Sequence, residues 1–293
     1  MASGVLLIDK PTGITSHDVV SRIRRIAGTR RVGHAGTLDP AASGLLLLGI
    51  ESSTRLLTYL VGLDKAYSAT IRLGVATATD DAEGERTGGA DATGLGTRTI
   101  ADAVAALTGE LEQVPSAVSA IKVDGRRAYA RVRAGEAVQL QPRRVSVPVF
   151  EVCAERRGAA VIDLDVRVEV SSGTYVRALA RDLGAGLGVG GHLTALRRTR
   201  VGPFGVADAV APEDGAMDAL RDPASVASAV LPVLHLDDAQ LADLVHGRRV
   251  PTESGDLAAA AALTPDGRLA GVVAVREGRL RVLANLPAAE VLA

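Results

Sequence analysis

The chain has 293 residues, 47% of them hydrophobic and 23% charged, and its formal net charge is −1 at pH 7. This composition is typical of a globular protein of about two domains and excludes a disordered or collagen-like chain. The single cysteine, Cys153, excludes an internal disulfide framework and favours the cytoplasm, and no apolar run is long enough for a signal peptide or a membrane helix.

The N-terminal residues predict a short strand followed by a helix. Residues 5–8 are apolar, and Thr15 to Asp18 have the form of a capping box. Apolar residues then follow at helical spacing up to Gly28, namely Val19, Val20, Ile23 and Ile26.

Residues 33–44, GHAGTLDPAASG, place three glycines around one carboxylate, Asp39. Glycine allows a ligand or another backbone to approach closely, and Pro40 favours a turn or a helix start. Two interpretations are open: Asp39 caps a helix over residues 41–48, or it is a functional carboxylate. The spacing alone favours the cap.

The middle of the chain predicts a strand, a loop and a helix. Residues 67–73 alternate between Tyr67, Ala69, Ile71 and Leu73 on one side and polar residues on the other, which indicates a half-buried strand. Residues 76–98 are rich in Thr, Asp, Gly and Ala and predict a polar loop. A helix capped by Thr99 and Asp102 is expected to follow.

Strict alternation over residues 161–170 predicts a second strand, and a helix follows it directly. The apolar stripe of that helix, formed by Val176, Leu179, Ala180 and Leu183, leaves Arg177 and Arg181 on another face. The GxGxxG match at residues 186–191 follows a helix and not a strand, so it predicts a helix-terminating loop. Because strands and helices mix without strict βαβ alternation, the fold class is α+β with a largely antiparallel sheet.

Pro, Ala and Asp dominate residues 203–234, which marks a boundary. A short helix is predicted over residues 238–245, and a hairpin over residues 271–275 and 280–283 turning at Glu277-Gly278. The end of the chain is therefore expected to form a separate small β-rich module.

The small net charge hides an uneven distribution. Residues 75–115 hold two basic and eight acidic side chains, whereas residues 116–200 hold fifteen basic and eight acidic ones. Thirty of the 33 basic residues are arginine, whose planar fork suits phosphate contacts. The basic stretch is either a solvated face or a surface for a polyanion. The five scattered histidines give no metal site, and no lysine has the Walker A setting.

Three of the four tyrosines stand beside basic residues, in Lys65-Ala66-Tyr67, Arg126-Arg127-Ala128-Tyr129 and Tyr175-Val176-Arg177. A flat ring next to a cation suits the stacking of a base while its phosphate is held. Each pair alone is more often a surface pair whose cation extends into solvent. Their joint appearance favours a nucleic-acid partner.

Four blocks in order resemble the bacterial TruB-type family of tRNA pseudouridine synthases. They are residues 4–20 (GVLLIDKPTGITSHDVV), 33–46 (GHAGTLDPAASGLL), 65–84 (a KxY motif, an LG pair and a TxTxD run) and 172–205 (SGTYVRALARDLGAGLGVGGHLTALRRTRVGPFG). Residues 113–122, QVPSAVSAIK, depart from the family, which more often has a second proline and an aromatic or His before the Ser-Ala pair.

The resemblance implies isomerisation of uridine to pseudouridine at position 55 in the T-loop of tRNA, with base flipping and no cofactor or metal. It implies a pseudouridine synthase domain over residues 1–232, with a thumb-like insertion at about 115–145, and a PUA-like RNA-binding domain over residues 235–293. The protein is expected to be a cytoplasmic monomer that acts on the T-arm of tRNA without a guide RNA or a membrane.

By the same resemblance, Asp39 is the essential carboxylate, which either adds to C1′ of the sugar or removes a proton at C2′. Arg177 pairs with Asp39 and keeps it ionised, while Tyr67 stacks on the flipped uracil and accepts the C5 proton. The remaining site residues bind substrate or support the site: Tyr175 and Leu196 as pocket walls, His34 against the RNA, Lys10 and Lys65 as supports, and Arg126, Arg127, Arg131, Arg133, Arg143 and Arg144 as the phosphate-binding surface.

Three rival functions remain open at the level of sequence. The first is an RNA-binding or RNA-folding protein in which isomerisation is incidental. The second is a synthase that depends on a guide RNA. The third is a glycosidase or nucleosidase, but such enzymes normally need two carboxylates and the central motif offers one.

Overall fold

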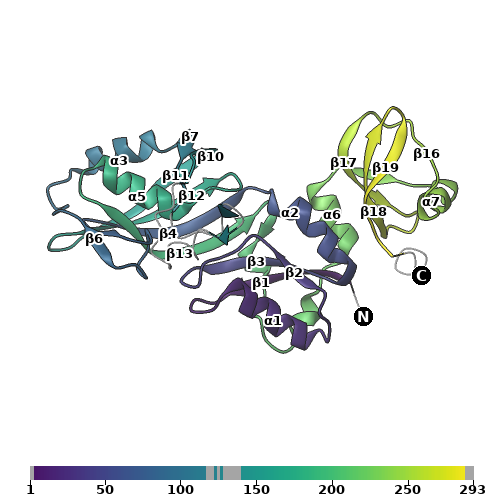
Figure 1. Cartoon of the computed structure of the whole chain (residues 1–293), viewed down its shortest axis with the longest axis horizontal. Helices are drawn as coiled ribbons and strands as arrows, with labels where there is room; N and C mark the ends of the chain where they lie inside the picture. Colours follow the sequence, from purple (N-terminus) through teal and green to yellow (C-terminus); the bar gives the residue numbers. More distant parts are fainter. Residues whose placement is uncertain (1–2, 117–121, 124–125, 128–139, 288–293) are drawn as a thin grey trace. The chain divides into compact units, whose positions relative to one another are not determined.

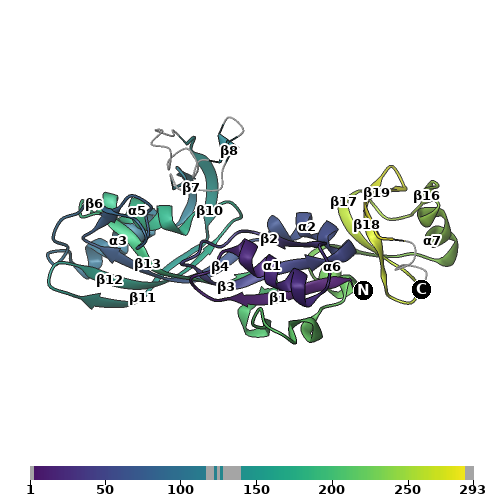
Figure 2. The same ribbon diagram turned by 60° about the horizontal axis from the view of Figure 1, so that its bottom comes forward.

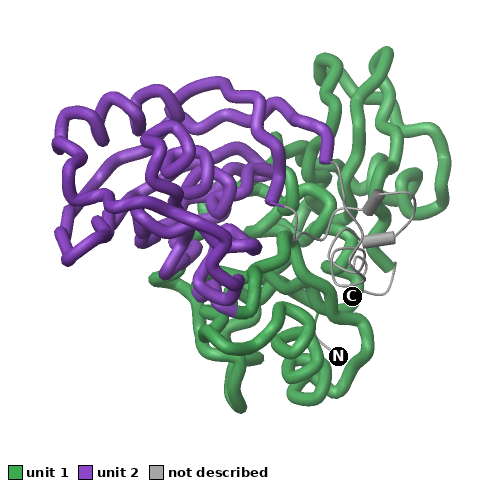
Figure 3. Tube along the Cα trace, turned by 60° about the vertical axis from the view of Figure 1, so that its left-hand side comes forward, with its two compact units in different colours: residues 1–40, 44–62, 202–293 green, residues 41–43, 63–201 purple. Residues whose placement is uncertain are grey.

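The computed structural model describes residues 3–116, 122–123, 126–127 and 140–287, and the chain divides into two compact units (Figure 3). Unit 1 comprises residues 1–40, 44–62 and 202–293, and unit 2 comprises residues 41–43 and 63–201. Each unit contains its own strands, helices and buried apolar side chains, and each is described by itself.

Unit 1 begins with three antiparallel strands and a helix, as Figure 1 shows. β1 (Gly4–Lys10) pairs along its length with β3 (Ser43–Ile50), and β2 (Val32–Ala35) also pairs with β3. α1 (Ser16–Ile26) begins at the predicted capping box, in which the Thr15 hydroxyl accepts a 3.0 Å hydrogen bond from the Asp18 N–H. The strand and helix predicted for this region are confirmed.

The apolar face of α1 packs against β1 and β3. Val19, Val20 and Ile23 of the helix form one buried cluster with strand residues Leu6, Ile8, Val32, Leu46, Leu48 and Ile50. Burial of this face fixes the helix against the strands. The first turn of α1 is thereby held beside the loop that joins β2 to β3.

Short helices and one short strand complete the N-terminal part of unit 1. They are η1 (Glu51–Leu56), α2 (Leu57–Val61), β14 (Phe204–Gly205), η2 (Val206–Asp208), η3 (Ala216–Ala219) and α6 (Pro223–Val230). The Asp222 carboxylate caps α6 by accepting a 2.9 Å hydrogen bond from the Ser225 N–H.

The C-terminal part of unit 1 is a five-stranded sheet with one helix. Its order is β15 (Val233–His235), β17 (Leu257–Leu263), β18 (Leu269–Arg276), β19 (Arg279–Asn285) and β16 (Val250–Pro251). The predicted helix is α7 (Asp238–Val245), and the predicted hairpin joins β18 to β19 through Glu277 and Gly278, at φ 50° and 69°. This is the β-rich module that the sequence predicts, while the two domain boundaries remain predictions.

Unit 2 is built on four antiparallel strands in the order β13 (Gly191–Val201), β4 (Lys65–Leu73), β12 (Ile162–Val170) and β11 (Val149–Arg157). The alternation predicted for residues 67–73 is confirmed, because Tyr67, Ala69, Ile71 and Leu73 are all buried. Among the named strands of the described residues within each unit, only β15 and β17 pair in parallel. The α+β fold with a largely antiparallel sheet is confirmed.

Two helices pack on this sheet (Figure 2): α5 (Val176–Gly186) against β13 and β4, and α3 (Thr97–Ala106) against β11. The predicted stripe of α5 is buried. The predicted capping of α3 by Thr99 and Asp102 is wrong, because the helix begins at Thr97 with Gly96 as N-cap. Asp102 instead forms a 2.9 Å ion pair with Arg98, which lies one turn earlier on the helix.

The segment predicted as a polar loop contains one short strand pair, β5 (Ala76–Thr77) with β6 (Arg86–Gly88). The predicted helix-terminating loop after α5 is confirmed, since Gly188 and Gly190 have φ values of 72° and 78°. A side chain at Gly184 would meet the backbone nitrogen of Gly191 at 2.1 Å, so helix and strand are in direct backbone contact here.

The predicted insertion at about 115–145 lies largely outside the described residues. Its two ends are β7 (Gly109–Gln113) and β10 (Arg143–Val147), which pair so that Gln113 lies opposite Arg143. Within it, β8 (Lys122–Val123) pairs with β9 (Arg126–Arg127).

Candidate active site

Asp39 lies half-buried in the loop between β2 and β3, and both of its neighbours are clamped. The Ser16 hydroxyl accepts from the Leu38 N–H at 2.9 Å and donates to the Leu38 carbonyl at 3.1 Å. On the other side, the Pro40 carbonyl accepts a 2.8 Å bond from the Gly13 N–H. Residues 43–50 form strand β3, so the interpretation of Asp39 as the cap of a helix over residues 41–48 is wrong. The apolar residues after Gly44 are buried along a strand and not along a helix face.

Lys10 supports the same loop through hydrogen bonds to backbone carbonyls. Its side chain is fully buried, and its ammonium donates to the carbonyls of Pro11 at 2.9 Å, Ile14 at 2.8 Å and Pro40 at 3.4 Å. Burial of a charge is tolerated when carbonyl dipoles replace its hydration shell. This geometry suits a supporting role, and it ties the loop before α1 to the residue that follows Asp39.

His34 lies on β2, five residues before Asp39. Its ring meets the ring of His17 on α1 edge to face, with centroids 5.6 Å apart and planes at 82°. His34 is half-buried and lies near the end of β2, where the loop that carries Asp39 begins.

Tyr67 is buried on β4 between two strands. Its register partners are Val168 on β12 and the buried Arg198 on β13. Leu196, which is half-buried, lies opposite Ala69 and therefore diagonal to Tyr67 on the same face. The structure brings together these two members of the predicted pocket.

Lys65 begins β4 on the same face as Tyr67. Its ammonium donates to the carbonyl of Leu63, and the side chain is buried. Burial, together with the neighbouring charge of Arg198, lowers the pKa of Lys65 to about 8, against an opposing effect of Asp64. Lys65 is therefore not a surface cation that extends into solvent beside Tyr67.

Arg177 lies in the first turn of α5, and its guanidinium is buried in a loop of unit 2. It donates to the Thr79 carbonyl at 2.8 Å and forms a 3.5 Å ion pair with Asp81. The Asp81 carboxylate also accepts from the Thr79 hydroxyl and from the Glu83 N–H. This TxTxD run is part of the resemblance to the TruB-type family, but no role was predicted for Thr79 or Asp81.

Asp80 pairs with the second arginine of the helix. Arg181 lies 3.4 Å from the Asp80 carboxylate and donates to the Val114 carbonyl at 2.7 Å. Burial raises the pKa of Asp80, with the nearby arginines Arg181 and Arg177 acting in the opposite direction. Two adjacent carboxylates thus hold the two arginines of α5.

Tyr175 is the N-cap of α5, and Gln113 holds its backbone. The Gln113 amide accepts from the Tyr175 N–H at 2.8 Å and donates to the Tyr175 carbonyl at 3.1 Å. The Arg143 guanidinium lies over the Tyr175 ring, 5.9 Å from its centroid. The interpretation of Tyr175 and Arg177 as a surface pair whose cation extends into solvent is wrong, because the Arg177 guanidinium is buried and bonded to Thr79 and Asp81.

The predicted phosphate-binding arginines are placed only in part. Arg126 and Arg127 form β9, while Arg131 and Arg133 lie outside the described residues. Arg143 and Arg144 begin β10. The role of this surface remains a prediction.

The candidate residues fall into two groups. Asp39, Lys10 and His34 belong to unit 1, and Tyr67, Lys65, Leu196, Tyr175 and Arg177 belong to unit 2. Because the two groups lie in different units, the pairing of Asp39 with Arg177 remains a prediction. In the described ranges, no group of three His, Cys, Asp or Glu side chains could hold a metal ion, and no helix is long and apolar enough to cross a membrane.

Two solved structures have this fold. One is described as an H/ACA RNP bound to a substrate RNA containing 2′-deoxyuridine, with a TM-score of 0.72 and 25% identity over 97% of this chain and 85% of that one. The other is a Cbf5-Nop10-Gar1 complex, with a TM-score of 0.73 and 26% identity over 98% of this chain and 86% of that one. These neighbours define the fold as that of the pseudouridine synthases.

Family models and curated relatives narrow this class further. Residues 24–176 match the TruB family pseudouridylate synthase N-terminal domain, and residues 177–233 match the tRNA pseudouridylate synthase B C-terminal domain. Proteins named tRNA pseudouridine synthase B are 56% identical in Leifsonia xyli, over 99% of both chains, and 63% identical in Rhodococcus jostii, over 70% of this chain and 67% of that one. The chain belongs to the TruB family of pseudouridylate synthases.

Proposed function

We propose that this protein converts uridine to pseudouridine in tRNA, at position 55 of the T-loop. The observation that carries the assignment is the clamped Asp39 loop, in which Ser16, Gly13 and Lys10 fix the residues on either side of a half-buried carboxylate. Family membership and relatives named as tRNA pseudouridine synthases support the substrate.

The reaction breaks the bond from N1 of uracil to C1′, turns the base, and forms a bond from C5 to C1′. The proton on C5 is lost and N1 gains one, so no atom is added overall and no cofactor is required. The protein must therefore hold a detached base and exclude water from the sugar.

Asp39 acts in its ionised form, either by adding to C1′ or by removing a proton at C2′. Arg177 pairs with it and stabilises the charged carboxylate in a pocket that disfavours charge. Tyr67 stacks on the flipped uracil, and its phenol accepts the C5 proton late in the reaction.

Other residues shape the site around these three. Tyr175 and Leu196 form pocket walls, His34 lies against the RNA, and Lys10 and Lys65 support the loops. Arg126, Arg127 and Arg131 contact phosphates of the T-arm, a shaped loop being recognised and not a linear sequence. We place the reaction in the cytoplasm because tRNA is the substrate and Cys153 is the only cysteine.

The test is Asp39→Asn, assayed by tritium release from uridine-labelled tRNA transcript and by mass analysis that locates the modified nucleotide. Turnover is expected to fall by at least about 1,000-fold, since the essential group is removed, while tRNA binding in a filter assay is retained. Asp102→Asn, at an exposed carboxylate on α3, is the matched control and keeps full activity. Turnover of Asp39→Asn near the wild-type rate refutes the assignment.

The same assay separates the rival functions. Purified protein alone is expected to modify an unmodified transcript, whereas a requirement for an added RNA favours a guide-dependent synthase. Free uracil among the products favours a nucleosidase. Tight tRNA binding without any pseudouridine favours an RNA-binding protein.

A further inference from the structure

The second half of α1 and the turn after it are strongly basic. Residues 22–31, RIRRIAGTRR, contain five arginines and no acidic residue, and all five arginines are exposed: Arg22, Arg24, Arg25, Arg30 and Arg31. In the part of the chain that the structure describes, Arg22, Arg25 and Arg30 form no ion pair, whereas several arginines on the sheet of unit 2 do: Arg72, Arg156, Arg167 and Arg200. Positive charge outside ion pairs is therefore concentrated on the second half of α1 and the turn after it.

A surface hollow of about 790 Å³ lies among these residues. Its lining consists of Ser21, Arg24, Arg25, Gly28, Thr29 and Arg30, with no carboxylate. Guanidinium groups bind phosphate oxygens through charge-assisted hydrogen bonds. Gly28, at φ 64°, turns the chain so that Arg30 returns toward the helix. The nearest carboxylate in contact with this lining is Glu51, which accepts from Thr29 and is paired with Arg31 at 3.5 Å.

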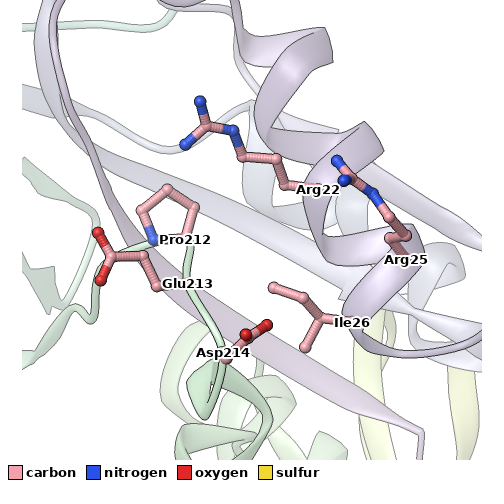
Figure 4. A pocket seen from close by; sticks show the side chains of 6 residues that line it. All are labelled: Arg22, Arg25, Ile26, Pro212, Glu213 and Asp214. Carbon is pink, nitrogen blue, oxygen red and sulfur yellow. The ribbon is translucent and has the colours of Figure 1, made fainter.

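A second hollow of about 740 Å³ adjoins the first, and Arg25 lines both. Figure 4 shows Arg22 and Arg25 extending from α1 on one side, with Glu213 and Asp214 on the other. Neither carboxylate lies within ion-pair distance of these arginines. The two carboxylates in the lining of the second hollow disfavour an anion there. The anion site is therefore confined to the first hollow.

We propose that the first hollow, centred on Arg25 and Arg30, binds a phosphate group of the RNA backbone. The proposal rests on the proposed function, which supplies the RNA, and it adds a phosphate contact outside the arginine-rich insertion. Arg24 and Arg25 also lie in the last turn of α1, where cations favour the negative end of the helix dipole. That effect does not account for Arg30, which lies beyond the helix and lines the same hollow.

The test compares Arg25→Gln/Arg30→Gln with Arg98→Gln/Arg156→Gln, a control that removes the same charge from two exposed arginines already in ion pairs. Affinity for tRNA is measured by filter binding across a range of salt concentrations. The first variant is expected to bind about tenfold more weakly and to lose about 1 from the slope of log K against log salt. The control keeps the wild-type slope, and all three proteins keep the same single-turnover rate at saturating enzyme.

Each other outcome bears on one claim. Equal slopes for the two variants overturn the phosphate site. Stabilisation of the wild-type protein, but not of Arg25→Gln/Arg30→Gln, by inorganic phosphate at constant ionic strength, with unchanged tRNA slopes, assigns the hollow to a free phosphate instead and also overturns it. Absence of pseudouridine with wild-type protein refutes the proposed function while leaving the binding comparison valid.

Gln113 carries a second inference, from a different observation. Its side chain is 2% exposed, and its amide pairs with both backbone groups of Tyr175 as a neighbouring strand would. Its register partner Arg143 lies over the ring of the same tyrosine. Two residues at the ends of the insertion thus converge on one residue of the predicted pocket.

We infer that Gln113 is a positioning residue, which fixes Tyr175 at the start of α5 for the proposed reaction. Gln113→Ala is expected to lower kcat by about 100-fold, whereas Gln141→Ala, at an exposed glutamine two residues before Arg143, is the matched control. The chain contains four tyrosines and no tryptophan, so ¹⁹F NMR with fluorotyrosine gives four resonances, of which Tyr175→Phe identifies one. Gln113→Ala is expected to shift that resonance.

Gln113→Glu supplies a readout that a merely structural role does not move. A protonated carboxyl has one donor and one acceptor like the amide, whereas the carboxylate has only acceptors. The activity of this variant relative to wild type is therefore expected to rise as the pH falls. A ratio that is independent of pH, with the Tyr175 resonance unmoved, overturns the inference.

Discussion

The loop that carries Asp39 and the loop that holds Arg177 are fixed by opposite kinds of contact. Around Asp39, the clamps are hydrogen bonds from Ser16, Gly13 and Lys10 to backbone groups, and every partner precedes Asp39 by fewer than 30 residues. Around Arg177, the contacts are a buried ion pair and a carbonyl, from residues nearly 100 positions away.

The difference has consequences for stability and for chemistry. The clamps act on the backbone of Leu38 and Pro40 and not on the Asp39 carboxylate, whereas the Arg177 guanidinium itself pairs with the Asp81 carboxylate and is predicted to serve a second one. A buried charge that loses its partner is costly, while a lost neutral clamp costs only the hydrogen bonds. The largest effects are therefore expected in unit 2.

Asp81→Asn is expected to have the largest effect. It removes the carboxylate charge that pairs with the buried Arg177 guanidinium, which is expected to lower the free energy of unfolding by about 3 kcal/mol. The value of kcat is expected to fall by about 100-fold because the position of the guanidinium changes. Urea unfolding and single-turnover assays measure the two. Asp182→Asn, which removes a more exposed carboxylate beside Arg181, serves as control and is expected to change both little. Equal effects from the two variants contradict the prediction.

The second prediction concerns the buried Lys65 ammonium of unit 2 and its effect on the free energy of unfolding. Its pKa in the folded protein is about 8, below the ordinary value of 10.5, so the unfolded chain binds more protons between these two pH values. Stability relative to Lys65→Met is therefore expected to rise with pH across this window, by up to about 3 kcal/mol. Urea unfolding of both proteins from pH 7 to 10.5 measures the difference. A constant difference shows that Lys65 is not desolvated.

Tyr67→Phe separates the ring from the hydroxyl on the same strand. Under the proposed function the phenylalanine ring stacks on uracil as the tyrosine ring does, so tRNA affinity is expected to stay within about twofold. Loss of the proposed proton acceptor is expected to lower the single-turnover rate by about 100-fold. The rate is measured by tritium release at saturating enzyme. An unchanged rate rules out proton transfer by Tyr67 and leaves it a stacking role.

Most of the local fold could be predicted from the sequence. The capping box at Thr15 to Asp18, the period-two strands and the Glu277-Gly278 turn depend on neighbouring residues, and each of them formed as expected. The helix over residues 41–48 was mispredicted because a continuous apolar run fits a buried strand as well as a helix. The cap of α3 was misplaced because Gly96, without a capping side chain, takes that position.

The candidate site could be predicted only as single residues. Asp39 was marked by its glycines and proline, but Thr79, Asp81 and Gln113 were not, since their partners lie 62 to 98 residues away. The neighbours of Tyr175 in sequence also did not reveal which cation lies over its ring: that cation is Arg143, while Arg177 is bonded to Thr79. The convergence of Gln113 and Arg143 on Tyr175 depends on the register of β7 with β10, and no local sequence pattern predicts that register.

Ser16→Ala tests the neutral side of the comparison and has the smallest expected effect. It removes the partner of both backbone groups of Leu38, at a residue that is 1% exposed, and is expected to lower the free energy of unfolding by about 2 kcal/mol. Activity is expected to fall about tenfold, since the residue before Asp39 then loses its clamp. Thr15→Ala is the matched control, because it removes the adjacent hydroxyl and the cap of the same helix, at a cost of about 1 kcal/mol, without touching the Asp39 loop. If Thr15→Ala lowers activity as much as Ser16→Ala does, the loss reflects the stability of α1, and the clamp on Leu38 has no special part in positioning Asp39.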